Sequence, residues 1–118
     1  MNRQPIALVL ASFLALGMSH AKSEAIEFSC FGYSDFKVDG DRLFRNGQLD
    51  SRALNVSVTS NYISWRESPD ALGFFGDFLI ERDTGTMTID EYSRDQSQPF
   101  RRARYTCTKR GEKGIGKI

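Results

Sequence analysis

Short segments in which every second residue is apolar run through the chain from residue 26 onward, and clusters of turn residues separate them. In the first segment Ile26, Phe28 and Cys30 alternate with Glu27 and Ser29. Successive side chains of a β-strand point to opposite faces, so this spacing gives each strand one core-facing side and one solvent-facing side. No long segment repeats its apolar residues at the 3.6-residue period of a helix. The pattern therefore predicts an all-β domain.

Tight turns between these segments favour antiparallel neighbours. Asp39-Gly40 has the residue types of a two-residue hairpin turn, and Asn46-Gly47 and residues 83–85 are further turn signals. We therefore expect a small antiparallel up-and-down meander of about seven strands. The expected strand regions are 26–30, the hairpin 36–44, 54–58, 62–66, 74–81, 86–92 and 102–108.

Residues 1–21 have the three parts of a secretory signal peptide. Arg3 precedes an uncharged apolar run over residues 6–17, and the small residues Ser19 and Ala21 occupy the positions expected before a cleavage site. The apolar run is shorter than the ~20 residues that span a bilayer. We predict cleavage, a periplasmic or secreted location, and no transmembrane segment in the mature chain. A buried N-terminal helix or an uncleaved anchor is the alternative.

Export determines the redox state expected for Cys30 and Cys107, the two cysteines of the chain. In an oxidising compartment we expect them to form a disulfide, and two unpaired buried thiols are the alternative. Bridged cysteines have Cα atoms within ~7 Å, so the first and last strands must meet. This favours a closed small barrel or a strongly curled sandwich. By the chain-entropy model, closing so long a loop contributes about 4 kcal/mol.

Charge is balanced overall and uneven along the chain. Residues 22–93 contain 7 basic and 13 acidic side chains, whereas residues 94–118 contain 8 and 2. The balanced total gives no general drive toward nucleic acid. The basic segment either contacts an anionic surface or neutralises the acidic remainder of the domain. We expect one β domain over residues 22–110 and a flexible basic tail over residues 111–118.

The sequence lacks most catalytic sets. Its one histidine, His20, lies in the predicted signal peptide, so the mature chain has no imidazole to serve as a base or metal ligand. This excludes Ser–His and Cys–His nucleophile pairs. Asp39 and Asp41 flank a glycine, but carboxylates are ordinary turn residues and we do not assign them to calcium. A carboxylate pair for glycoside hydrolysis stays open. We expect a non-catalytic protein with no metal and no cofactor.

Two features are candidates for a binding surface: an aromatic pair at the start of the most apolar strand, and the arginines of the last strand. Adjacent strand residues point to opposite faces, so one ring of the pair is partly exposed beside the loop over residues 67–72. Packing of that ring over the loop is the alternative. The single tryptophan, Trp65, is expected to anchor the core. The candidate surface comprises Phe74, Phe75, Arg101, Arg102 and Arg104.

Four short motifs carry a resemblance to known proteins. They are Phe-Ser-Cys at 28–30, Tyr-Ile-Ser-Trp at 62–65, the strand and turn at 80–85, and Tyr-Thr-Cys at 105–107. Together they resemble small exported bacterial β proteins. The layout is also similar to periplasmic C-type lysozyme inhibitors, which are small antiparallel barrels with a cysteine near each end and a tryptophan in a middle strand. After Trp65 this chain reads Arg66-Glu67-Ser68, in place of the Lys-Gly segment of those inhibitors.

Two functional hypotheses follow. The first is an exported, non-catalytic protein that binds a protein or cell-envelope partner, based on the predicted export, the stapled β architecture and the basic C-terminal segment. The second is a hydrolase or a hydrolase inhibitor that acts on cell-wall sugars, and the resemblance implies the inhibitor. A lipid or small-ligand carrier is a further alternative, although so few short strands leave little interior space.

Overall fold

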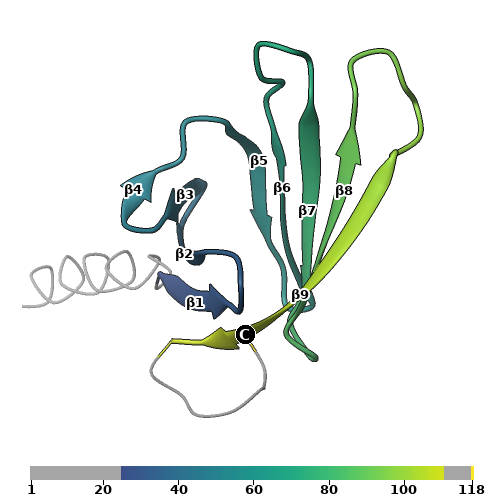
Figure 1. Ribbon diagram of the computed structural model, residues 1–118. Coiled ribbons are helices and arrows are strands. Elements are labelled where there is room, and N and C mark those ends of the chain that lie inside the picture. Colours follow the sequence, from purple (N-terminus) through teal and green to yellow (C-terminus); the bar gives the residue numbers. More distant parts are fainter. Residues whose placement is uncertain (1–24, 111–117) are drawn as a thin grey trace, which may run out of the picture.

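Strands and turns make up the part of the chain that the computed structural model describes, residues 25–110 and residue 118 (Figure 1). The all-β class is therefore confirmed, while the predicted signal peptide, residues 1–21, lies outside the described residues. The strands are β1 (Ile26–Cys30), β2 (Asp35–Asp39), β3 (Arg42–Arg45), β4 (Gln48–Leu49), β5 (Ala53–Val58), β6 (Tyr62–Glu67), β7 (Phe75–Glu81), β8 (Thr86–Tyr92) and β9 (Arg101–Lys109).

The described strands form one antiparallel sheet in the order β4-β3-β2-β1-β9-β8-β7-β6-β5. The predicted number of about seven is wrong, because the region from β2 to β4 makes two consecutive hairpins and contributes three strands, the last of only two residues. The second of these turns is tight: Asn46 and Gly47 have φ angles of 51° and 84°. Positive φ at both central residues is the requirement of a type I′ hairpin turn, which Asn-Gly meets at little cost.

Strand β9 belongs to both halves of the curled sheet. Its first part, from Arg101 to Thr106, pairs with β8, and its last part, from Cys107 to Lys109, pairs with β1. The sheet bends around this long strand into a half-barrel (Figure 1). Strands β4 and β5 stand at its two ends, and no ladder joins them within the described residues. The strong curl was predicted, whereas a fully closed barrel is not what forms.

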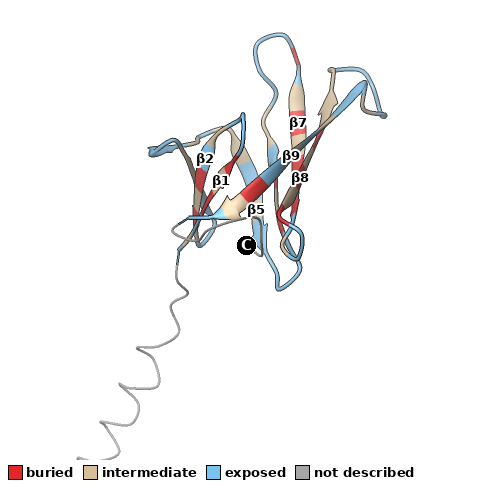
Figure 2. Ribbon diagram, turned by 60° about the horizontal axis from the view of Figure 1, so that its bottom comes forward, coloured by how far each residue is buried: buried red, intermediate tan, exposed pale blue. Residues whose placement is uncertain are grey.

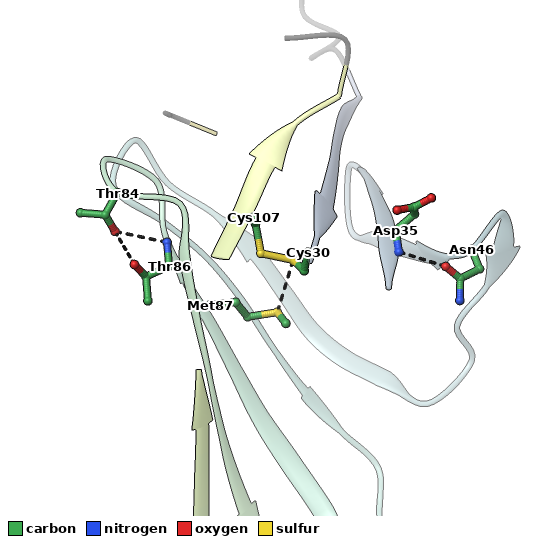
Figure 3. Close-up of a disulfide and its surroundings, with 7 residues drawn as sticks. All are labelled: Cys30, Asp35, Asn46, Thr84, Thr86, Met87 and Cys107. Atoms are coloured by element: carbon green, nitrogen blue, oxygen red, sulfur yellow. Dashed lines mark hydrogen bonds between the residues drawn. A yellow bond between two sulfur atoms is a disulfide. The ribbon is translucent and has the colours of Figure 1, made fainter. Parts of the chain in front are cut away.

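The predicted disulfide joins Cys30 and Cys107 at the point where β9 passes from β8 to β1 (Figure 3). The two residues are direct cross-strand partners with Cα atoms 3.9 Å apart. Neither donates its N–H to the other: Cys30 donates to Ser34 O and Cys107 donates to Gly85 O. A pair without mutual hydrogen bonds is the arrangement that brings antiparallel Cα atoms closest, and this geometry suits a cross-strand bridge. The Sδ atom of Met87 lies 3.9 Å from Cys30 Sγ.

The core fills the concave side of the half-barrel, where the apolar positions of the alternating strands converge (Figure 2). Trp65 is 3% exposed, with its ring 4.8 Å from that of Phe78 and 5.3 Å from that of Phe36. The prediction that Trp65 anchors the core is therefore confirmed. The buried apolar residues are Phe28, Cys30, Phe36, Val38, Leu43, Ile63, Trp65, Phe78, Ile80, Met87, Ile89, Cys107 and Ile118.

Ile118 joins this core although it belongs to the predicted flexible tail. The rest of that tail, residues 111–117, lies outside the described residues. Ile118 is 6% exposed, its N–H donates to Arg82 O at 3.0 Å, and an Arg82 guanidinium nitrogen donates to Ile118 O at 3.2 Å. The chain therefore returns to the half-barrel at this residue.

We expect the double variant Cys30→Ala/Cys107→Ala to unfold with a free energy about 4 kcal/mol below that of the oxidised protein, because the bridge restricts the unfolded chain. Urea unfolding followed by tryptophan fluorescence measures this difference. Wild-type protein under a reducing agent should match the variant. An unfolding free energy that stays unchanged in both the double variant and the reduced wild type would show that strand pairing and packing hold the sheet together without the bridge.

Candidate functional site

A concave pocket of about 530 Å³ opens at the end of the half-barrel that carries the β6–β7 and β8–β9 loops. We call it the mouth pocket. Side chains from the inner faces of β6 to β9, from both loops and from the turn after β1 line it, so segments far apart in sequence meet there. Its most prominent lining residues are Tyr33, Arg52, Glu67, Phe74, Glu91, Phe100, Arg101 and Tyr105.

Charged side chains line the floor of the mouth pocket. The Glu67 carboxylate lies 3.6 Å from the Arg45 guanidinium and 3.8 Å from that of Arg52. One Glu67 oxygen is also 3.4 Å from the place where a Cβ on Gly76 would stand, so the glycine allows this carboxylate to approach the β7 backbone. Burial raises the pKa of Glu67 above its ordinary value, and the charges of Arg52 and Arg45 act against that rise.

Arg45 reaches the floor from β3, in the other half of the sheet. Its guanidinium carbon lies 5.3 to 5.6 Å from the ring centres of Tyr33, Phe36 and Phe78. It is also 3.7 Å from a carboxylate oxygen of Asp50. Two of its nitrogens are buried without a hydrogen-bond partner among the described residues. Aromatic faces and carboxylates thus hold this cation by charge and packing, and it ties β3 to β6 across the open side of the sheet.

The β6–β7 loop is held at both ends by one side chain. The Arg52 guanidinium donates to Ser68 O at 3.1 and 2.7 Å and to Phe74 O at 3.4 Å. Within the loop, Asp70 Oδ1 accepts the N–H groups of Leu72 and Phe74, both at 2.9 Å. These backbone hydrogen bonds, that of Phe74 foremost, lower the pKa of Asp70. We call residues 68–74 the clamped loop.

The clamped loop also packs on the β8–β9 loop. Gly73 has a φ of 90°, and a Cβ there would lie 2.7 Å from the Cβ of Arg94, so only glycine allows this approach. The rings of Phe74 and Phe100 meet edge to face with centres 5.9 Å apart. They remain 42% and 51% exposed. We call these two rings the aromatic rim of the mouth pocket.

The sequence-predicted binding residues fall into two groups on opposite faces of the sheet. Phe74, Phe75 and Arg101 line the mouth pocket. Phe75 stacks on Tyr92 with ring centres 5.1 Å apart, and the strand alternation places it on the outer face with Arg102 and Arg104. The structure therefore brings Phe74, Phe75 and Arg101 to one pocket, with the Phe75 ring turned toward the outer face, and leaves Arg102 and Arg104 on that opposite face.

On the outer face the basic residues are largely paired with acidic ones. Arg102 makes two hydrogen bonds to Asp90, at 2.6 and 3.0 Å, and they lower the pKa of that carboxyl. Arg66 binds Asp77 in the same way on the next strands. Two further arginines of the basic segment pair with acidic partners in the earlier part of the chain: Arg101 with Glu91 at 3.4 Å and Arg110 with Asp35 at 3.5 Å. For these arginines the structure favours neutralisation of the acidic part of the chain.

Several pocket residues were not predicted from the sequence, although a signal for them exists. Glu67 continues the inward parity of Ile63 and Trp65 in β6, and Arg45 does the same after Leu43 in β3. A charged residue at a core-facing position marks the end of the apolar core. Phe100, the one aromatic residue in the polar stretch before β9, gives a weaker signal.

A second, larger hollow of about 780 Å³ lies beside the disulfide, along the turn that carries Phe31. The Phe31 side chain is 87% exposed. Phe31, Tyr33 and Asp35 line this hollow together with several hydroxyls and one amide, so Asp35 is the one charged side chain among its lining residues. We regard the mouth pocket as the candidate functional site because five charged side chains, from separate strands and loops, converge there beside aromatic ones.

Comparison with protein-family models, with curated proteins and with solved structures found no match to this chain. Within the described residues, no group of three or more His, Cys, Asp or Glu side chains is arranged to hold a metal ion. The same residues contain no helix with the length and hydropathy of a membrane span.

We expect Arg52→Ala to free the clamped loop while the sheet stays folded, because three carbonyl contacts are lost together. Amide hydrogen exchange at Leu72, Gly73 and Phe74 should accelerate by about tenfold or more, whereas exchange in β7 should change little. Arg66→Ala, which removes an arginine of similar exposure from the outer face, is the matched control. Unchanged exchange at the three amides would show that the Asp70 hydrogen bonds alone order the loop.

Proposed function

We propose that this chain is an exported, non-catalytic protein, periplasmic or secreted, that binds a protein or cell-envelope partner at the mouth pocket. The observation that carries the proposal is the aromatic rim: two large apolar rings, 42% and 51% exposed, stand at the opening of a pocket with charged walls. Exposed apolar surface beside a pocket of this kind is typical of a binding site.

Hydrogen bonds that hold the rim residues in place support this proposal. Arg52 and Asp70 hold the loop that carries Phe74, and Phe100 donates its N–H to Glu91 O at 2.8 Å. A partner would meet these side chains already in place, so binding would not have to order a flexible loop at a cost in conformational entropy. Loops that are held in place on a disulfide-linked sheet are therefore suited to binding a partner.

The chemistry of the pocket favours binding over catalysis. Its inner carboxylates, Glu67 and Glu91, each face an arginine, and the mature chain contains no histidine. A general acid or base must exchange its proton with a substrate near neutral pH. Both carboxylates are held by guanidinium groups, an arrangement suited to hydrogen bonding with a ligand. Burial raises the pKa of Glu67, and the charges of Arg52 and Arg45 act against that rise.

Two observations support export. Residues 1–21 have the pattern of a signal peptide, and the Cys30–Cys107 disulfide is of the kind that persists in oxidising compartments. Removal of the leader would leave the β domain free to meet envelope components.

We expect Phe74→Ala/Phe100→Ala to weaken retention of the protein on a washed cell-envelope fraction by at least tenfold, since the two rings supply the apolar contact. Co-sedimentation at mild salt measures retention, with bound protein quantified over a range of concentrations. Leu79→Ala removes an apolar side chain of similar exposure, 41%, from the outer face and should leave retention unchanged. Equal retention of all three proteins would remove the mouth pocket from the proposal.

The second candidate function is inhibition of a cell-wall hydrolase, and the clamped loop is the observation that favours it. Leu72 projects from this loop with 73% of its side chain exposed, while Asp70 hydrogen bonds fix the backbone on either side of Gly73. A projecting, preorganised loop can enter the cleft of an enzyme without paying for its own ordering.

We expect an inhibitor of this kind to reduce the activity of a C-type lysozyme on cell-wall substrate at micromolar excess. Leu72→Asp should then abolish inhibition, whereas Leu79→Asp on the outer face should retain it. Full lysozyme activity in the presence of the wild-type protein would exclude C-type lysozyme as the target.

A further inference from the structure

We propose that the ligand of the mouth pocket is a neutral glycan, one of whose sugar rings lies against the aromatic rim while its hydroxyls bind the charged walls. This inference rests on the proposed binding function and adds the chemical class of the ligand. Three properties of the pocket carry it: the charge balance of its walls, the kinds of hydrogen-bonding groups they present, and the exposed faces of its rim.

The charges around the pocket compensate one another. Each charged group of the lining has a partner: Glu91 pairs with Arg101, Glu67 faces Arg52 and Arg45, and Asp70 accepts backbone N–H groups. Arg45 also pairs with Asp50. The charged groups are Glu67, Asp70, Glu91, Arg45, Arg52 and Arg101. An anionic ligand such as a phosphate ester would need an excess of guanidinium groups, and a cationic ligand would need uncompensated carboxylates. The balance therefore favours a ligand without net charge.

The polar groups nonetheless require a hydrogen-bonding ligand. Carboxylates only accept hydrogen bonds, and guanidinium groups only donate them. A hydroxyl both donates and accepts, so one such group on the pocket side can bond to Glu91 and Arg101 together, whose charged atoms are 3.4 Å apart. A purely apolar ligand would remove these ion pairs from water without offering them further hydrogen bonds, which costs free energy. Closely spaced hydroxyls on a rigid frame are the chemistry of a sugar.

The aromatic rim provides an apolar surface beside these polar groups. Phe74 and Phe100 both line the pocket, and in their edge-to-face contact they keep 42% and 51% of their surface exposed. The axial C–H groups of a pyranose form an apolar patch that packs on such a ring, while the equatorial hydroxyls point sideways toward polar walls. With about 530 Å³ open to one side, the pocket has room for a terminal sugar while the rest of a chain extends outward.

The test is a titration of the isotope-labelled mature protein with neutral tetrasaccharides of glucose, mannose and N-acetylglucosamine at up to millimolar concentration. We expect saturable chemical-shift changes at the backbone amides of Gly76, Glu91 and Phe100 for at least one of these probes. Tetragalacturonate, which is anionic, and tetraglucosamine, which is cationic, should bind at least tenfold more weakly than the best neutral probe. Absence of saturable binding by every neutral probe, or tighter binding of a charged one, overturns the inference.

Single substitutions test whether the rim and the pocket carboxylates bind the neutral tetrasaccharide. Phe100→Ala should weaken the best neutral probe about tenfold or more, and Phe100→Tyr should restore binding because its ring keeps the stacking face. Glu91→Gln should also weaken binding, since it removes a charged acceptor and leaves Arg101 unpaired. Leu79→Ala on the outer face should bind as the wild type does. Each variant is assayed only after its amide spectrum shows the wild-type sheet.

The glycan inference and the proposed function fail separately. If the envelope fraction retains the protein through the aromatic rim but no neutral tetrasaccharide binds or competes, the partner is not a neutral glycan and the binding function stands. If a tetrasaccharide binds at the rim but the envelope fraction does not retain the protein, the pocket takes sugars and its ligand lies outside the envelope.

Discussion

The pairing of β9 with two different neighbours is the constraint on which the rest of the fold depends. This strand leaves β8 at Thr106 and joins β1 at Cys107, so among the described strands it alone links the ladder of β1–β4 to that of β5–β8. The disulfide to Cys30 stands at that junction. Contacts across the concave side depend on it: Tyr33, which follows β1, lies 4.8 Å ring to ring from Tyr105 of β9. The mouth pocket exists because the two halves are held together at this point.

The open side of the half-barrel is bridged differently. Arg45 of β3 faces Glu67 of β6 at 3.6 Å, in place of the strand ladder that would close a barrel. Taking both charges out of water costs roughly as much as their attraction returns, so this pair contributes position rather than stability. Stability comes from the apolar core around Trp65 and from the disulfide. The charged bridge instead brings polar groups to the rim of the sheet while the sheet stays open there.

Much of the fold follows from the sequence because period-two alternation and turn chemistry are local signals. They identified the strands, the Asn46-Gly47 turn and Trp65 as core. The two-residue strand β4 escaped prediction, since so short a segment has no period to detect. The site was predicted only in part. Phe74 was predicted because it belongs to an aromatic pair at the start of the most apolar strand. Its partner Phe100 lies 26 positions away in another loop, and only the folded sheet shows that the two loops meet.

The grouping of the arginines shows why composition alone misjudges such a site. Arg101 and Arg102 are neighbours in the sequence and belong to one basic run, but the alternation of β9 sends the first to the pocket and the second to Asp90 on the outer face. A better rule considers every second residue of a strand, which faces the core. At the pocket end of β9, β6 and β3 the core-facing position is occupied by a charged residue, Arg101, Glu67 and Arg45 respectively. Where inward apolar positions give way to charge on adjacent or facing strands, the core ends and a polar-walled pocket begins. This pattern can be read from sequence once the strands are assigned.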